Sequence, residues 1–249
     1  MDAGVIPGTF LLLLSLLVLL VVLILRGRKG PIPSVRPLPA FQDIRTEAGY
    51  AAESGGAVHI ALGNGGLYGE DSVTSLAGLQ VVESLADIAV SYGAPPIITV
   101  GDPTLLPLAQ DVLRRAYERN GAAESYDPGK VRFVAPSPVA YAAGAANLVA
   151  TGKVTANVTT GAFGHEVSLL ADAGARRDLP QLAAAADPAA IGALYPTTDR
   201  LAVGEELYAA GAQMTDERRY LTSLVAQDIL RLILILLMLG SAVIGFMGR

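Results

Sequence analysis

Two long apolar stretches, one near each end of the chain, most constrain what this sequence can fold into. The first covers residues 3–25, which include no charged residue, and about 20 apolar residues are enough to cross the hydrocarbon core of a bilayer. A cleaved signal peptide is the alternative, but it would carry positive charge before the apolar run and a small-residue cleavage site after it. Here Asp2 precedes the run and the basic sequence Arg-Gly-Arg-Lys follows it. We therefore predict an uncleaved transmembrane helix over residues 3–25.

The second apolar stretch covers residues 232–248 and is bounded by Arg231 and Arg249. The segment upstream of it also has a helical pattern, so we predict one helix over residues 215–248 that leaves the soluble domain and enters the bilayer. A buried core helix is the alternative. The stretch is apolar on every face, which is typical of a membrane span rather than of a helix in a domain this small.

Basic residues beside both stretches predict the orientation of the protein. They gather at residues 26–29 beside the first stretch, and at Arg218, Arg219 and Arg231 beside the second. Positive residues favour the cytoplasmic side of a membrane. Both clusters therefore place the region between the spans in the cytoplasm and both termini outside, and Arg249 is a single charge against this orientation. We expect a protein of the cytoplasmic (inner) membrane, with the lipid bilayer as one partner.

The composition of the chain excludes several kinds of site. There is no cysteine and there are two histidines, so a disulfide framework, a thiolate zinc site and a multi-histidine metal centre are not expected. Residues 37–217 contain 21 acidic and 10 basic residues, a balance of −11, which disfavours binding of nucleic acid. Walker, kinase, serine-nucleophile and His-Glu-x-x-His motifs do not occur in the sequence. We predict no metal, no cofactor and no catalytic residues.

The region between the spans is predicted to be an α/β domain. Residues 26–45 form a basic, proline-rich juxtamembrane linker, and the soluble domain is expected over residues 46–214. Within it, short apolar strand candidates alternate with helices whose apolar positions recur every three or four residues. The expected strands cover residues 57–62, 96–100, 131–135, 154–159 and 181–185; the expected helices cover 72–92, 105–119, 139–150 and 166–175, followed by a short helix and the segment 205–212. This alternation predicts a Rossmann-like, mostly parallel sheet flanked by helices.

Three strand ends continue into a polar residue followed by proline. These pairs are Asp102-Pro103, Ser137-Pro138 and Asp187-Pro188. A capping side chain followed by proline is typical of a helix start, because the side-chain oxygen accepts a free amide and proline needs no partner there. The pairs therefore support repeated strand–turn–helix units.

A glycine-rich loop follows the first expected strand, at the sheet edge where ligands of such folds bind. It supplies five candidate ligand-binding residues: Gly63, Asn64, Gly65, Gly66 and Gly69. Its spacing departs from the dinucleotide fingerprint, which requires glycine at Tyr68, and Asp102 lies beyond the usual ~20 residues for the acidic member of that motif. Glu70 and Asp71 would repel a phosphate. The loop and Asp102 are a candidate ligand crevice, with a flexible glycine turn as the alternative.

A second candidate loop covers residues 159–166 and combines hydroxyls, glycines, a histidine and a carboxylate. Thr160, Gly161, Gly164 and His165 are its candidate binding residues. His165 and Glu166 are adjacent in sequence, which does not by itself form a catalytic pair or a metal site. The other histidine, His59, lies inside an expected strand, where we expect it to be a structural residue with its hydrogen bonds satisfied.

A structural function is the leading expectation for the chain. Ser241 and Gly245 form a small-x-x-x-small pair that allows two membrane helices to approach closely, and tethering at both ends raises the effective concentration of the domain for lateral contacts. We expect a scaffolding protein that assembles into a large homo-oligomeric ring or cage. The alternatives are a membrane-tethered sensor that binds a nucleotide or small metabolite at the two candidate loops and, less favoured, an accessory subunit that contacts other membrane proteins.

Several segments together carry a resemblance to a known family. They are "HIALGNGGLYG", "ITVGDPTLLPLAQDVLRRAYERNG", "VRFVAPSPVAYAAGAANLVA", "GEELYAAGA" and "AQDILRLILILL". In this order, behind an apolar span and a proline-rich linker, they resemble an uncharacterised family of prokaryotic two-span membrane proteins that is defined as a domain of unknown function. The resemblance covers nearly the full length. It implies two spans around a Rossmann-like domain and supplies no catalytic residues.

Overall fold

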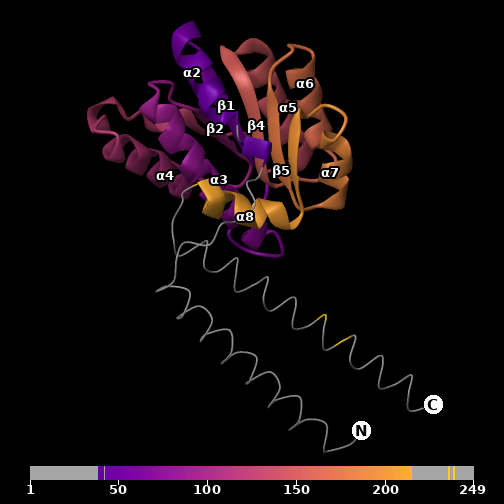
Figure 1. Ribbon diagram of the computed structural model, residues 1–249. Coiled ribbons are helices and arrows are strands. Elements are labelled where there is room, and N and C mark those ends of the chain that lie inside the picture. The colour runs from indigo at the N-terminus through magenta and orange to yellow at the C-terminus, as the bar shows by residue number, and fades with distance from the viewer. Residues whose placement is uncertain (1–38, 42, 215–234, 236–237, 239–249) are drawn as a thin grey trace, which may run out of the picture. The chain divides into compact units, whose positions relative to one another are not determined.

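The computed structural model describes residues 39–41, 43–214, 235 and 238 (Figure 1). The described helices and strands belong to one compact unit, Pro37–Thr215. The predicted membrane helix over residues 3–25 lies outside the described residues. So does the predicted helix over residues 215–248, apart from residues 235 and 238.

Six parallel strands form a single sheet in the order β3-β2-β1-β4-β5-β6. The strands are β1 (Ala57–Gly63), β2 (Ile97–Val100), β3 (Val131–Phe133), β4 (Val154–Ala162), β5 (Gln181–Ala185) and β6 (Arg200–Val203). Strands β1, β4 and β5 are buried almost throughout, as expected for a parallel sheet covered on both faces. The strand order reverses between β1 and β4, which is the topological switch point of a Rossmann-like fold.

Helices cover both faces of the sheet (Figure 1). The elements outside the sheet are η1 (Pro39–Phe41), α2 (Ile44–Ser54), α3 (Ser72–Ser91), α4 (Leu106–Arg119), η2 (Ala123–Ser125), η3 (Pro128–Lys130), α5 (Pro138–Thr151), α6 (Val167–Ala175), α7 (Pro188–Leu194) and α8 (Glu205–Met214). One core joins α2, α3, α4 and α8 to one face of the sheet. A second core joins α5, α6 and α7 to the other face.

Within the described residues, α3 is the one helix long and apolar enough to cross a membrane. Its Val82 and Leu85 are almost fully buried and belong to the core between α3 and the sheet. Because this burial accounts for the apolar character of α3, the helix serves here as the central core helix of the α/β unit.

The predicted α/β class and the parallel Rossmann-like sheet are confirmed, and the structure adds elements that the sequence pattern did not indicate. Strand β6 and helix α2 were not predicted. Strand β4 extends to Ala162, so Thr160 and Gly161, expected in a loop, lie in the strand. Phe41 and Ile44, which fall within the linker predicted over residues 26–45, are buried in the core.

The three polar residue–proline pairs differ in what they do. Asp187 caps α7, because its side chain accepts hydrogen bonds from the amides of Ala189 and Ala190. Ser137 precedes α5 without a side-chain capping bond. Asp102 lies three residues before the cap position of α4 and its carboxylate instead bonds Thr104. Only one of the three predicted caps therefore forms.

Candidate functional site

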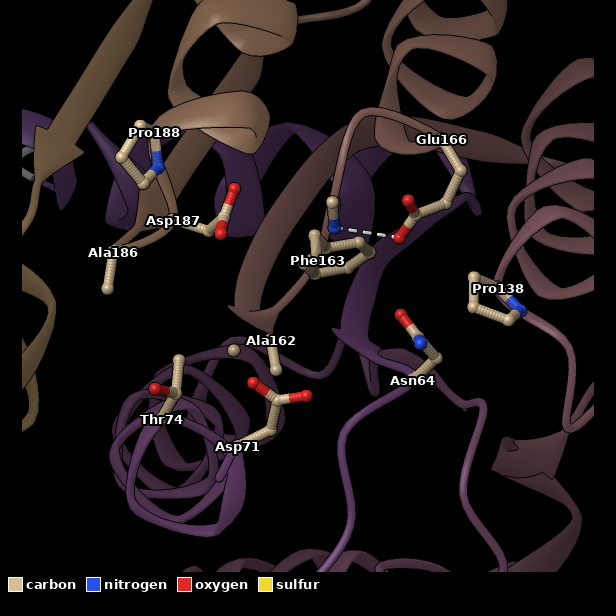
Figure 2. Close-up of a pocket in the computed structure, with 12 residues that line it drawn as sticks. Asn64, Asp71, Thr74, Pro138, Ala162, Phe163, Glu166, Ala186, Asp187 and Pro188 are labelled. Atoms are coloured by element: carbon tan, nitrogen blue, oxygen red, sulfur yellow. Dashed lines mark hydrogen bonds between the residues drawn. The ribbon is translucent and has the colours of Figure 1, made fainter. Parts of the chain in front are cut away.

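A cleft of about 500 Å³ opens where the strand order reverses, at the carboxyl ends of β1, β4 and β5 (Figure 2). The chain following β1, the start of α3, the start of α5, the end of β4 and the turn into α7 all contribute to its wall. Its lining residues are Asn64, Asp71, Thr74, Pro138, Gly161, Ala162, Phe163, Gly164, Glu166, Ala186, Asp187 and Pro188.

Close glycine contacts shape the floor of the cleft. Gly63 and Gly161 have positive φ angles of 84° and 105°, and a Cβ atom on Gly161 would lie 2.3 Å from the carbonyl oxygen of Leu62. A Cβ atom on Gly78 of α3 would lie 2.7 Å from the Cα atom of Gly161. Glycine is therefore required at these positions for β1, β4 and α3 to approach one another.

Two carboxylates in the cleft are held by backbone amides. Glu166 is 6% exposed, and its Oε1 atom accepts a hydrogen bond from the amide of Gly164 at 2.8 Å (Figure 2). The Oδ1 atom of Asp187 accepts from the two capping amides at 2.7 and 3.2 Å. In each carboxylate the second oxygen has no hydrogen bond to any described residue, so it can accept one from a bound molecule.

Asn64 and Thr74 contribute neutral polar groups to the same wall. The Oδ1 atom of Asn64 is buried and has no hydrogen-bond partner within the described part of the chain. In Figure 2 the amide of Asn64 is directed towards the side of the cleft formed by Phe163 and Glu166. The hydroxyl of Thr74 is 3.1 Å from the hydroxyl of Tyr208. Asn64 therefore presents a buried acceptor that has no partner among the described residues.

The cleft is electrostatically negative. Its described lining residues include the carboxylates of Asp71, Glu166 and Asp187 and no lysine, arginine or histidine. Three carboxylates around one concave surface reinforce one another's potential, because the low-dielectric walls focus the field. The site therefore attracts cations and hydrogen-bond donors and repels phosphates.

A chain of buried polar side chains crosses the sheet below the cleft. His59 on β1 bonds Asn157 on β4 through Nδ1 at 2.8 Å and Thr99 on β2 through Nε2 at 3.0 Å. The Nδ2 atom of Asn157 donates to Gln181 on β5 at 3.3 Å. We name Thr99, His59, Asn157 and Gln181 the polar seam. Its hydrogen bonds confirm the prediction that His59 is a satisfied structural residue.

Tyr141 of α5 connects the polar seam to the floor of the cleft. Its hydroxyl is 3.1 Å from the Thr99 hydroxyl, donates to the Thr99 carbonyl at 3.2 Å and accepts from the Gly63 amide at 3.3 Å. Burial raises the pKa of Tyr141 to about 12, although these hydrogen bonds oppose the shift. The phenol is therefore neutral, and it fixes the point where β1 turns into the glycine-rich loop.

The structure brings only some of the predicted site residues together. Asn64, Gly161 and Gly164 line the cleft. Gly65 and Gly66 are buried. Gly66 lies against Asp102, because a Cβ atom on Gly66 would lie 2.7 Å from the Asp102 carboxylate. Asp102, Gly65 and Gly66 are not among the lining residues. These three residues therefore belong to the glycine-rich loop or pack against it, and they do not face the cleft.

Gly69, Thr160 and His165 do not line the cleft either. Gly69 is an exposed turn residue with φ of 91°, and His165 is exposed. Thr160 is fully buried and pairs with Ala184, which belongs to the core on the α3 side of the sheet. The alternation of side chains along β4 therefore points Thr160 into that core.

Several lining residues were not among the sequence candidates. The sequence indicates Asp71 only as a residue that would repel phosphate, and Asp187 only as a helix cap. Pro138 was predicted only as the proline of a helix start, and Thr74 and Ala186 had no signal of their own. Each follows or precedes a strand end, so the expected strand–helix alternation is the one signal that could have placed them at the same sheet edge.

Fold and cleft together define the class of the protein: a Rossmann-like α/β domain with an acidic crevice at its switch point. The chain belongs to the family described as "Domain of unknown function (DUF6754)", whose model matches residues 7–248. This membership agrees with the expectation of a family without a known function, while the prokaryotic origin and the two membrane spans that the resemblance implies stay predictions. Neither the curated proteins nor the solved structures include a match to the chain.

Proposed function

We propose that the chain is a membrane-tethered binding module that holds a small polar molecule in the cleft between β1, β4 and β5. The observation that carries this proposal is the position of the cleft, which is the switch point where open α/β sheets bind their ligands. Its volume of about 500 Å³ falls within the ~300–1,000 Å³ of small-molecule sites. The tether in this proposal is the pair of predicted membrane helices.

A thermal-shift screen of the detergent-solubilised full chain against a library of small metabolites tests this function. A ligand at a hundredfold excess over its dissociation constant stabilises the folded state by ~2.7 kcal/mol. Ala186 lines the cleft, so Ala186→Phe should fill it. Ala189 lies in α7, is exposed and is not a lining residue, so Ala189→Phe is the matched control.

We expect at least one compound to raise the melting temperature of the wild type and of Ala189→Phe, and to leave Ala186→Phe unchanged. Compounds that stabilise all three proteins equally would place binding elsewhere and contradict the proposal. So would a screen in which no compound acts on the wild type.

Lateral assembly into a homo-oligomeric scaffold is a second candidate function, supported by apolar side chains on two contacting helices. Val73 and Leu76 on α3 are 63% and 46% exposed, and Tyr208 on α8 is 40% exposed. Val73 and Leu76 lie three residues apart on one face of α3, and the Tyr208 hydroxyl lies close to Thr74 between them in sequence. We name Val73, Leu76 and Tyr208 the α3–α8 patch.

Mass photometry of the gently solubilised protein tests the scaffold candidate. A large uniform particle that becomes smaller in Leu76→Glu supports assembly through the α3–α8 patch. Leu169→Glu is the control, because Leu169 on α6 is similarly exposed at 44% and lies outside the patch. A wild type that is monomeric even at high protein concentration would rule the scaffold out.

A further inference from the structure

We infer that the cleft binds a small organic cation that carries several separated N–H donors, such as a diamine or an amino-bearing metabolite. This inference rests on the proposed binding function and adds the chemical class of the ligand. Four features of the cleft support this class of ligand: a buried carboxylate, an unpartnered buried acceptor, the sign of the surrounding charge and the size of the cleft.

The buried carboxylate of Glu166 is the first argument. Its side chain is almost fully removed from solvent and has one hydrogen bond, from the Gly164 amide. No ion pair to Glu166 exists among the described residues. The Oε2 atom of this carboxylate accepts no hydrogen bond from a described residue, so a ligand that supplies a positive charge or a donor here is favoured.

The amide oxygen of Asn64 is the second, independent argument. This Oδ1 atom is buried without a partner in the described structure and belongs to a residue of the cleft wall. An unsatisfied buried acceptor destabilises the folded state, and a ligand that donates a hydrogen bond to it removes this cost. Asn64 and Glu166 thus both offer acceptors to a ligand that carries donors, and they follow different strands, β1 and β4.

Phosphate ligands are disfavoured despite the helix start at the cleft. The amino terminus of a helix such as α3 carries roughly half a positive charge and attracts anions. Asp71 stands at the cap position of α3 and lines the cleft, as do Glu166 and Asp187. Up to three full negative charges outweigh half a positive one, so the net preference is for a cation.

The spacing of the acidic groups favours an organic cation over a metal ion. Within the described residues, no three acidic or histidine side chains stand close enough together to hold one metal ion. The cleft, at about 500 Å³, is also far larger than a metal ion needs. An extended molecule with donors at separate positions can reach the carboxylates and Asn64 at once.

Titration of the full chain with putrescine and with succinate tests this inference. The two probes share a four-carbon backbone and differ in charge sign, and titration at 0.15 M NaCl screens non-specific surface attraction. We expect putrescine to raise the melting temperature and succinate to have no effect. Because asparagine also caps helices well, Asp71→Asn combined with Asp187→Asn should weaken putrescine binding about tenfold or more without loss of the α7 cap.

Glu53→Gln combined with Glu124→Gln is the matched control. Both glutamates are exposed and lie outside the cleft lining, and the two substitutions remove the same total charge as the cleft variant. Equal weakening in both double variants would reduce the effect to overall charge and overturn the inference. Stabilisation by succinate, inorganic phosphate or Mg²⁺ alone would overturn it as well. A neutral library compound that binds the cleft while putrescine does not would refute the ligand class and leave the proposed binding function intact.

Discussion

Replacement of His59 by glutamine should remove a large part of the acid sensitivity of the fold. The pKa of His59 is lowered from 6.5 to about 4, mainly by burial; the hydrogen bond to Asn157 opposes the shift and the nearby Arg132 adds to it. The neutral imidazole is therefore the form that the folded state accepts. In the unfolded chain the ring is solvated and titrates near its ordinary pKa.

The size and direction of the effect follow from this difference. Between pH 6.5 and 4 the unfolded chain binds a proton that the folded chain does not, so stability falls as the pH falls through this window. A pKa difference of about 2.5 corresponds to ~3 kcal/mol. The contribution of neutral His59 to the unfolding free energy is fully present above pH 6.5 and is lost below pH 4.

Urea unfolding of the detergent-solubilised full chain, followed by circular dichroism at several pH values, measures the effect. Carboxylates titrate in every variant, so the quantity compared between variants is the slope of the unfolding free energy against pH. We expect His59→Gln to lose ~3 kcal/mol less than the wild type between pH 7 and pH 4. His165→Gln is the control, because His165 is exposed and is the chain's other histidine. Equal slopes for His59→Gln and the wild type would refute the reasoning.

Substitutions at three further positions test other parts of the site. Tyr141→Phe should cost ~1–3 kcal/mol of unfolding free energy in urea titrations, because it leaves the buried Gly63 amide without its acceptor; an unchanged midpoint would show that the hydroxyl contributes nothing. Gly78→Ala should lower stability by ~1–3 kcal/mol by overpacking against the Gly161 backbone, which outweighs the ~1 kcal/mol gain in helix propensity; a higher melting temperature would contradict this. Asp187→Ala should cost ~1 kcal/mol and Asp187→Asn much less, and equal losses by calorimetry would show that the cap is not the cause.

Hydrophobic patterning was sufficient to predict the sheet because its central strands are apolar runs between helices with a clear period. Strand β1 reads as apolar residues around one histidine, and α3 repeats its apolar residues every three or four positions. Strand β6 escaped prediction because it has four residues and begins with Arg200. Helix α2 escaped because its buried face is formed by Ile44 and two alanines, which give little contrast in hydrophobicity.

The candidate site was predicted less well because tertiary packing decides which residues at a strand end line the cleft. Thr160 and Gly161 are neighbours in sequence, yet Gly161 lines the cleft and Thr160 points into the opposite core. The extension of β4 by three residues beyond its predicted end determines this difference. Asp102 was a reasonable candidate at a strand end, but its carboxylate bonds Thr104 and lies behind Gly66.

The polar seam also has a consequence for how the strands find their places during folding. Apolar contacts between strands are tolerant, because a slip of two residues keeps every side chain on its own face. The polar seam is not tolerant, because such a slip of one strand would separate His59 from Asn157 or Thr99. Each buried group left without a partner would cost about 1–3 kcal/mol. The four residues of the polar seam lie on four strands, so all of their hydrogen bonds form in only one alignment of the sheet. That alignment also fixes the arrangement of the strand ends that form the cleft.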